Sequence, residues 1–431
     1  MRKLFSLLLL TLVLTPAWGQ YERQVRKIDF QDYYRNANYD EALVPEYELP
    51  DPLRCLDGTQ VTTVRQWEQH RRPELMALLE TYMYGRAPQP DATFRWEVVR
   101  TDPTFRDGRA TRRDVILHLT AEGPDVPLCI VVPNGPKSGG RLPAFLALSF
   151  HENDSIWQSE RAMQSWCPDT LLAHGYGLVT FHYTDAELDK ASDRFRSSSL
   201  HQHFYQAGQS YPLPDEWGAV ACWAWTLSRA MDYLETDDLV DARRIALLGH
   251  SRLGKAVLWA GAIDQRYRIV IPVNSGCCGA ALSRRCVGET VECVNEFNPQ
   301  WFSQNFLQFS HRESLLPFDQ HEVIAMIAPR PVYIASAEDD NWADQRGEFL
   351  SAKAAEPVYA LYGLPGILTE VPAAGSASGG EAPALLSVSD LPAVDVPASS
   401  GTIAYHIRRG PHAVLPFDWQ QFIRFADRFL K

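Results

Sequence analysis

An α/β fold, in which helices cover both faces of a mostly parallel central sheet, is predicted by three features of the sequence. Apolar strand-like runs alternate with helical segments through the second half of the chain. These runs are apolar at nearly every position, as expected of strands buried on both faces. The 431 residues are 45% hydrophobic and 22% charged, which is the composition of a globular protein rather than a disordered or fibrous one.

The first residues are expected to be a secretory signal peptide, 1–19, and no part of the fold. Arg2 and Lys3 precede an apolar run, and small residues follow before a predicted cut ahead of Gln20. The run is too short to span a bilayer comfortably, so no membrane association is expected. We therefore expect an exported monomer, periplasmic or extracellular, whose mature chain, 20–431, is a single domain.

The first part of the mature chain is expected to contain little regular structure. Residues 20–75 are polar and aromatic, with three prolines between 45 and 52, and predict an extended N-terminal wrap. A helix is expected from Pro73 to about Met83. Runs rich in Val, Ile and Leu then predict strands over 94–100, 113–120, 127–132 and 142–150. The earliest of these resemble hairpins and suggest an antiparallel start to the sheet.

The remaining chain alternates between the two kinds of element. Apolar residues at helical spacing predict a long helix over 215–235. Strands are expected at 177–183, 245–248, 269–273, 331–337 and 402–407, with helices at 253–262, 320–327, 348–359 and 417–430. Residues 366–400 are dominated by Ala, Gly, Pro, Ser and Val without periodicity, and are expected to be a low-complexity loop insertion before the last strand.

Charge and cysteine content restrict the partners and cofactors. The chain has 41 Lys and Arg against 53 Asp and Glu, a net charge of −12, so nucleic acid is not an expected partner. None of the eight cysteines forms Cys-x-x-Cys, which argues against a structural zinc site, and no cofactor is expected. Four cysteines lie between 277 and 293, where disulfides and buried free thiols are both open for an exported chain.

A serine on a sharp turn is the strongest indication of chemistry in the sequence. Ser251 lies in Gly249-His-Ser-Arg-Leu-Gly-Lys255, between an expected strand and an expected helix. Such a turn exposes the serine Oγ and aims the next backbone N–H at a developing oxyanion. The usual motif is Gly-x-Ser-x-Gly, but Leu253 stands at the second glycine position and Gly254 follows one residue late. A serine that only caps a helix is the alternative.

The chain order Ser, acid, His of α/β-hydrolases locates two further candidates. Asp339 and Asp340 follow the strand expected at 331–337, where the acid should lie. Register favours Asp340, with Asp339 as second choice. His412 lies between the last strand and the last helix, where the base is expected. The loop at His151 is placed to add backbone donors to an oxyanion hole.

These candidates belong to a wider set of motifs that resembles the glucuronoyl esterases, carbohydrate esterase family 15. The resemblance extends from about residue 60 to the end of the chain. It is carried by Gly249–Lys255, Ser275–Ala281, Gly288-Glu289, Trp301-Phe302, Ala328–Pro331, Asp340–Asp344 and Tyr405–Arg408. It implies an α/β-hydrolase fold and cleavage of the ester between 4-O-methyl-glucuronic acid of xylan and lignin alcohols. Glucuronoxylan and lignin–carbohydrate esters are the implied partners.

The resemblance also implies a role for each matching residue. Ser251 is the implied nucleophile and His412 the implied base. Arg252 is the residue whose guanidinium and backbone N–H would stabilise the oxyanion. The implied contacts to the uronate are Lys255, Glu289 and Trp342.

Asn274 departs from the pattern of fungal members of this family. Some members carry a catalytic Glu just before the Ser-Gly of the strand after the nucleophile, where this chain has Asn274. An amide does not hold a charged imidazole as a carboxylate does. The acid must therefore come from the later loop, an arrangement that resembles many bacterial members.

Two-step acyl transfer is the mechanism expected of such a site. Three other functions stay open on the sequence alone. One is a different carbohydrate esterase, such as an acetyl xylan esterase. A glycoside hydrolase would need two facing carboxylates. The third is a non-catalytic carbohydrate-binding relative.

Overall fold

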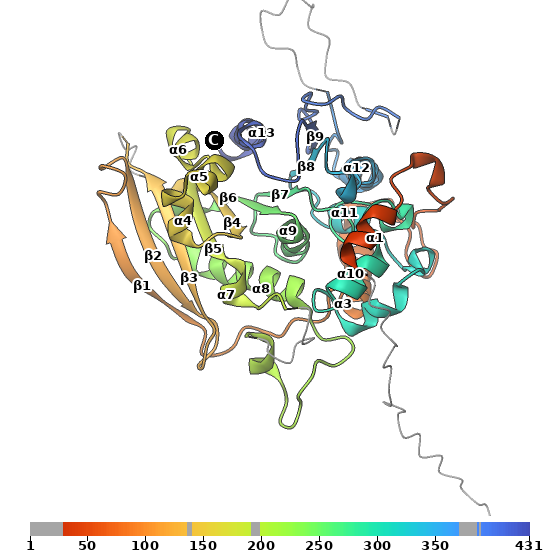
Figure 1. The fold of residues 1–431 in the computed structure, drawn as a ribbon, viewed down its shortest axis with the longest axis horizontal. Coiled ribbons are helices and arrows are strands. Elements are labelled where there is room, and N and C mark those ends of the chain that lie inside the picture. Colours follow the sequence, from red (N-terminus) through yellow and green to blue (C-terminus); the bar gives the residue numbers. More distant parts are fainter. Residues whose placement is uncertain (1–28, 136–139, 191–198, 370–385, 388) are drawn as a thin grey trace, which may run out of the picture.

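The computed structural model describes residues 29–135, 140–190, 199–369, 386–387 and 389–431. These residues form one nine-stranded sheet with helices on both faces (Figure 1), in the strand order β1-β2-β3-β5-β4-β6-β7-β8-β9. The predicted α/β fold with a mostly parallel sheet is confirmed. The expected signal peptide, 1–19, lies outside the described residues, as do residues 370–385 and 388 of the expected insertion at 366–400.

The sheet is antiparallel at one edge and parallel elsewhere. The pairs β1–β2, β2–β3 and β3–β5 are antiparallel, and every later pair is parallel. The strands are β1 Arg95–Asp102, β2 Ala110–His118, β3 Asp125–Pro133, β4 Leu142–Ser149, β5 Gly177–His182, β6 Val240–His250, β7 Ile269–Val273, β8 Val332–Ala337 and β9 Ile403–Arg408. The antiparallel start expected from the sequence is therefore present, at β1 to β3.

Two hydrophobic cores lie on opposite faces of this sheet in the described part of the chain. Figure 1 shows α13 with α4 to α6 on one side of the strands, and α8 and α9 on the other. The adjacent residues Ala246 and Leu247 of β6 are fully buried and belong to different cores. Successive side chains of a strand point to opposite faces, which is why the central strands are apolar at nearly every position.

The helices are closest to expectation where the apolar periodicity is strongest. They are α1 Phe30–Asn36, α2 Val64–Gln66, α3 Arg72–Tyr82, α4 Asn153–Gln158, α5 Glu160–Trp166, α6 Pro168–Ala173, α7 Tyr183–Ala186, α8 Ala219–Leu234, α9 Arg252–Ile263, α10 Val291–Phe297, α11 Gln320–Ala325, α12 Gln345–Leu361 and α13 Pro416–Leu430. The short helices α4 to α7 and α10 were not predicted, because each offers too few turns to establish a period.

The expectation of little regular structure over 20–75 agrees with residues 37–63, which contain only a short 3₁₀ turn and one isolated bridge, but it fails at α1 and from Val64 onward. Helix α1 begins after Asp29, whose side chain accepts hydrogen bonds from two backbone N–H groups of the first turn. A longer helical stretch begins at Val64, where the Thr63 side chain accepts from Gln66 N–H, and continues through a π-helical turn into α3. Pro73, which has no backbone N–H to donate, is the second residue of α3 and directly follows the π-helical turn, in which Arg72 N–H donates to Trp67 O.

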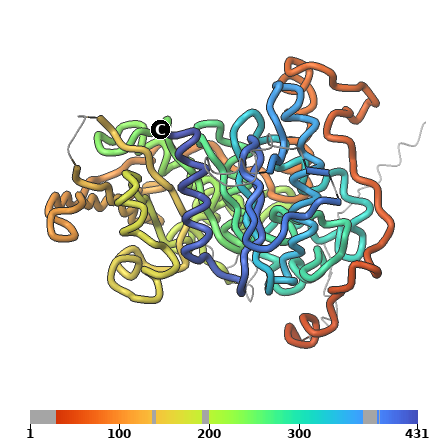
Figure 2. The backbone as a smooth tube through the Cα atoms, turned by 90° about the horizontal axis from the view of Figure 1, so that it is seen from above, coloured from red at the N-terminus to blue at the C-terminus, as the bar shows by residue number. Residues whose placement is uncertain are grey.

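The N-terminal segment that begins with α1 lies against the second half of the chain. In Figure 2 this segment, drawn in red, runs along the outer side of the part drawn in cyan and blue. Asn38 accepts a hydrogen bond from Gly288 N–H at 2.8 Å, and Glu41 forms an ion pair of 2.6 Å with Arg285. The segment is thus fixed beside the loops that follow β7.

All eight cysteines lie in the described residues, and all are free thiols. Cys277 and Cys278 have their sulfur atoms 3.7 Å apart without a bond between them. The sequence left both disulfides and buried free thiols open for residues 277–293, and the structure has free thiols there. Of the helices that the structure describes, none combines the length and the apolar character needed to cross a bilayer.

Candidate active site

Ser251 occupies a strained turn between β6 and α9. Its φ of 59° and ψ of −129° lie in a backbone region that residues other than glycine rarely adopt. The backbone holds it there, because Ser251 N–H donates to Val273 O at 2.8 Å on the neighbouring strand β7. Such a turn presents the serine side chain at the carboxyl end of the parallel strands.

The two glycines of the serine motif are required by close packing. A Cβ on Gly249 would lie 2.2 Å from Leu253 O. A Cβ on Gly254 would lie 2.8 Å from Ser275 Cβ and 3.1 Å from Gly249 O. The late second glycine thus marks where α9 approaches the loop after β7. Leu253, at the usual glycine position, is fully buried in the core instead.

His412 and Asp340 are joined by a short hydrogen bond. His412 Nδ1 lies 2.6 Å from Asp340 Oδ2, and the Asp340 side chain is 4% exposed while that of His412 is 39% exposed. Asp340 follows β8 directly, and His412 lies between β9 and α13. Asp339 is exposed and donates its backbone N–H to Gly410 O, so the carboxylate that contacts the histidine belongs to Asp340.

One cavity brings together the seven residues that the sequence analysis favoured for catalysis or substrate binding. Its volume is about 460 Å³. The seven candidates on its wall are Ser251, Arg252, Lys255, Glu289, Asp340, Trp342 and His412. The other lining residues are Phe30, Tyr34, Asn274, Ser275, Gly276, Phe297, Asn298, Trp301 and Ala343. Serine, histidine and carboxylate in one pocket are the groups that nucleophilic acyl transfer requires.

Arg252 is held by an acid that the sequence analysis missed. Its Nη1 donates to Asp189 Oδ2 at 2.5 Å, and its guanidinium lies 5.0 Å from the Trp301 ring centre. Asp189 Oδ1 also accepts from Gln300 Nε2 at 2.7 Å and from Trp301 Nε1 at 2.8 Å. Arg252 Nε is buried and has no hydrogen-bond partner among the described residues. The Nε–H group of Arg252 is therefore a buried donor left unsatisfied in the described part of the chain.

Lys255 is buried with all of its donors engaged by the protein. Nζ donates to Ser275 O at 2.8 Å, to Cys277 O at 2.5 Å and to Glu289 Oε2 at 2.7 Å. Burial alone would lower the pKa of Lys255, but the Glu289 carboxylate and the two cysteine sulfurs outweigh it and raise that pKa. Lys255 therefore stays charged and fixes Glu289 and the loop after β7 at the cavity wall.

In the loop after β4, the backbone N–H of His151 is engaged by the loop itself. His151 N–H donates to Ser149 Oγ at 2.9 Å, and the same hydroxyl donates back to His151 O at 2.7 Å. None of residues 150–154 lines the cavity. A local turn therefore takes up the backbone N–H of His151, and a contribution to an oxyanion hole from the other backbone donors of this loop stays a prediction.

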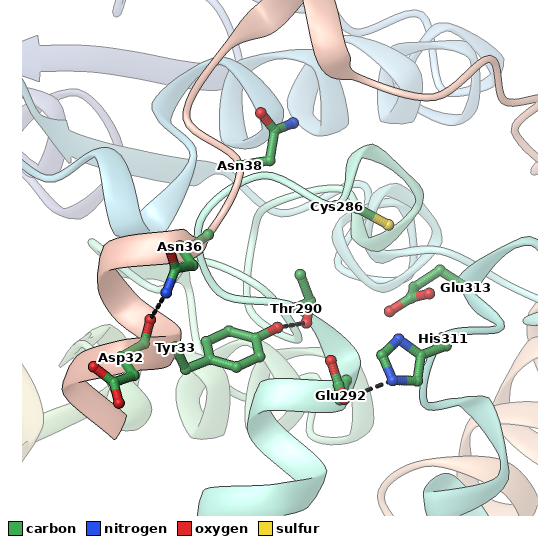
Figure 3. Close-up of a pocket in the computed structure, with 10 residues that line it drawn as sticks. Asp32, Tyr33, Asn36, Asn38, Cys286, Thr290, Glu292, His311 and Glu313 are labelled. Atoms are coloured by element: carbon green, nitrogen blue, oxygen red, sulfur yellow. Dashed lines mark hydrogen bonds and ion pairs between the residues drawn. The ribbon is translucent and has the colours of Figure 1, made fainter. Parts of the chain in front are cut away.

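The N-terminal helix α1 adds two further residues that the sequence analysis did not identify. Phe30 and Tyr34 line the cavity together with Ser251. On another side of α1, Tyr33 lines a separate polar cavity of about 440 Å³, which Figure 3 shows with Glu292, His311 and Glu313. The i, i+4 spacing of Phe30 and Tyr34, after the capping residue Asp29, is a sequence signal for this helix.

One group in the part of the chain that the structure describes has ligand atoms close enough together for a metal ion. Glu152, His182 and Asp185 place one such atom each within 4.8 Å of the others. They lie outside the active-site cavity, and Glu152 is exposed. The groups in the cavity itself are those of nucleophilic catalysis.

Known proteins resemble this chain over most of its length. The family model of fungal glucuronyl esterases matches residues 161–363. A protein named carbohydrate esterase, from an unknown prokaryotic organism, is 39% identical over 429 residues, which cover 92% of this chain and 93% of that protein.

Two solved structures are similar at comparable identity. One, titled as a promiscuous esterase of carbohydrate esterase family 15 from a marine bacterial metagenome, has a TM-score of 0.79 at 38% identity, over 91% of this chain and 100% of that chain. A glucuronoyl esterase from Solibacter usitatus has a TM-score of 0.81 at 37% identity, also over 91% and 100%.

Proposed function

The chain belongs to the glucuronoyl esterases of carbohydrate esterase family 15, carboxylic ester hydrolases of the α/β-hydrolase fold that act on esters of glucuronic acid, and we propose how it does so and on which ester. The proposed substrate is the ester between 4-O-methyl-glucuronic acid of xylan and a lignin alcohol. The proposed catalytic triad is Ser251, His412 and Asp340. The observation that carries this assignment is the 2.6 Å contact of His412 Nδ1 with buried Asp340, in the cavity that Ser251 also lines.

The first step is attack by Ser251 Oγ on the C6 carbonyl of the uronate. Asp340 accepts the Nδ1 proton of His412 and so leaves Nε2 free to take the proton of Ser251. The new bond joins Oγ to the carbonyl carbon, and the carbonyl oxygen becomes an oxyanion. The strained φ of Ser251 supports this assignment, because backbone strain of this kind accumulates at reacting residues.

Arg252 is the proposed partner of the oxyanion. It is the first residue of α9, so its backbone N–H has no partner within the helix. Its Nε–H is also unused, and its charge is fixed in place by Asp189. A pre-oriented positive group beside a developing negative oxygen lowers the barrier without reorganisation at the moment of reaction.

Loss of the alcohol completes the first step, and hydrolysis in the second step returns the enzyme to its starting state. His412 gives its proton to the alcohol oxygen as the bond between that oxygen and the carbonyl carbon breaks. Water then attacks the glucuronoyl-enzyme, His412 accepts its proton, and Ser251 regains a proton as the free uronate leaves. Glu289 and Trp342 are the proposed contacts to the sugar, with Lys255 holding Glu289 in position.

A comparison of ester substrates tests this function. The wild-type chain should cleave methyl and benzyl glucuronate much faster than acetylated xylan, and Ser251→Ala should abolish cleavage of both glucuronates. Ser389→Ala, on an exposed loop before β9, is the matched control and should keep full activity. Full activity of Ser251→Ala would overturn the triad. Faster cleavage of acetyl esters by the wild type would favour an acetyl xylan esterase.

Export and oligomeric state belong to the same proposal. We propose that residues 1–19 are removed during export and that residues 20–431 act as one monomeric domain. N-terminal sequencing of the secreted protein should begin at Gln20, and light scattering should give the mass of one chain.

A further inference from the structure

Four aromatic rings gather at one end of the active-site cavity, and two of them come from the N-terminal helix. Phe30 and Tyr34 lie one turn apart on α1 and so share one side of it. Their ring centres lie 5.7 Å and 5.0 Å from that of Trp342. Phe297, at the end of α10, lies 5.1 Å from Phe30. We call Phe30, Tyr34, Phe297 and Trp342 the aromatic wall.

The rings on α1 do not fill a hydrophobic core. Phe30 is 41% and Tyr34 is 42% exposed, and α1 has no buried residue. Large apolar side chains that are left in water beside a catalytic serine gain free energy when a ligand covers them. Their position on the cavity wall, rather than under the helix, is what a binding surface requires.

Polar contacts hold α1 in place, which leaves its aromatic side chains free to meet a ligand. Tyr33 OH is hydrogen-bonded to Thr290 Oγ1 at 2.5 Å, as Figure 3 shows. Further along the segment, Arg285 pairs with both Glu41 and Asp344, at 2.6 and 2.8 Å. These contacts tie the helix to the loops that carry Glu289 and Trp342. The wall is therefore built from three separate parts of the chain in a fixed arrangement.

The charged groups of the cavity gather around a different ring. Arg252 and Lys255 lie 5.0 and 5.7 Å from the centre of the Trp301 ring, and Lys255 contacts Glu289. A uronate with its hydroxyl groups fits that polar part. The aromatic wall carries no charge, so it suits the part of an ester substrate that has no hydroxyls to satisfy.

We propose that the aromatic wall is a subsite for the aryl group of the ester alcohol, and that Phe30 and Tyr34 on α1 set a preference for aryl over methyl esters. The inference rests on the proposed function, since it takes glucuronate esters as substrates. Trp342 adjoins the polar part as well, because its backbone O accepts a hydrogen bond from Glu289 N–H at 3.0 Å while its ring contacts Phe30 and Tyr34.

The ratio of kcat/KM for benzyl glucuronate to that for methyl glucuronate measures this preference. Phe30→Ala and Tyr34→Ala should each lower the ratio by about 3- to 10-fold, the effect expected from the loss of one aromatic contact. Phe30→Leu keeps a large apolar side chain but removes the ring, and should lower the ratio too. Tyr34→Phe keeps the ring and should keep the ratio. Leu43→Ala, on the same segment but away from the cavity, is the matched control.

Three outcomes would overturn the proposal. Equal losses on both esters would mean that α1 only supports the site. A lowered ratio in Leu43→Ala would mean that the ratio reports loosening of the segment. A larger loss on the methyl ester of a glucuronoxylo-oligosaccharide than on benzyl glucuronate would assign the wall to the xylan chain. A wild type that cleaves none of these esters would instead contradict the proposed function itself.

Discussion

Asn274 donates a hydrogen bond from Nδ2 to Asp340 Oδ2 over 3.0 Å, and the same carboxylate oxygen contacts His412 Nδ1 at 2.6 Å. Asn274 adopts a φ of 47°, a left-handed conformation that Asn tolerates better than most residues. The amide thus orients the carboxylate that faces the histidine. It stands at the end of β7, where a fungal-type sequence would carry the acid itself.

Asp340→Asn should lower kcat by about a thousandfold or more, because an amide no longer fixes the histidine tautomer or stabilises the imidazolium. Asp339→Asn is the matched control, since Asp339 is an exposed neighbour of the same charge. It should keep nearly full activity on methyl glucuronate. Equal losses in the two variants, or a larger loss in Asp339→Asn, would move the acid away from Asp340.

Asn274→Asp should shift the acid limb of the pH profile of kcat/KM upward by about one unit. A second carboxylate next to Asp340 favours the protonated imidazole, so the free base of His412 forms only at higher pH. His250, whose ring centre is 4.5 Å from that of His412, adds no charge, because burial holds its pKa well below the usual value.

Asn274→Ala supplies the control for that shift. It removes the hydrogen bond to Asp340 without adding charge. It should therefore lower kcat/KM and leave the pH of the acid limb of its profile unchanged. An unchanged limb in Asn274→Asp, measured over pH 4 to 9 with methyl glucuronate, would contradict the electrostatic role of this position.

Asp189→Asn should lower kcat by about 10- to 100-fold, with a smaller effect on KM, because Arg252 loses its ion pair and is no longer aimed at the oxyanion. Asp189 is a positioning residue in this view, since it acts through Arg252 and Trp301. Asp185→Asn, on α7 and outside the cavity, is the control and should leave both constants unchanged. A change in KM alone would indicate that Asp189 shapes the sugar site instead.

The gathering of the candidate catalytic residues could be predicted from the sequence because each is placed by a local pattern. Ser251, Asp340 and His412 each follow directly after a strand, and the ends of parallel strands meet at one edge of a sheet. Only the order of the strands was needed to predict that these three residues meet at one cavity. The packing reason for the late Gly254 is also local, since it concerns the first turn of α9 and the adjoining loop.

The supporting residues could not be found in this way. Asp189 reaches Arg252 from a segment 63 positions away, and no pattern around it differs from a surface acid. Phe30 and Tyr34 reach the cavity because α1 packs against α10 and the loop after β8, a contact that depends on the folded tertiary structure. Periodicity of short helices is weak, so both α1 and its contribution were lost in a segment expected to be irregular.

The last prediction concerns Glu348, a buried carboxyl beneath the loop that carries Asn274. It accepts from Ser275 N–H at 2.9 Å, from Gly276 N–H at 3.0 Å and from Ser336 Oγ at 2.5 Å. Burial is the largest influence and raises the pKa of Glu348 to about 7. The folded protein therefore holds this proton more tightly than the unfolded chain does, whose Glu pKa is about 4.3.

This difference makes the protein less stable as the pH rises from about 4.3 to about 7, by an amount of the order of 3 kcal/mol, after which the loss is complete. Glu348→Gln cannot titrate, so its free energy of unfolding relative to the wild type should rise over the same interval and then level off. Urea unfolding at pH 5, 6, 7 and 8 measures this. Glu322, whose pKa burial raises to about 8, titrates in both proteins and cancels in the difference. Glu338→Gln is an exposed control, and its free energy of unfolding relative to the wild type should not change with pH. The same lack of pH dependence for Glu348→Gln would mean that Glu348 keeps one charge state throughout.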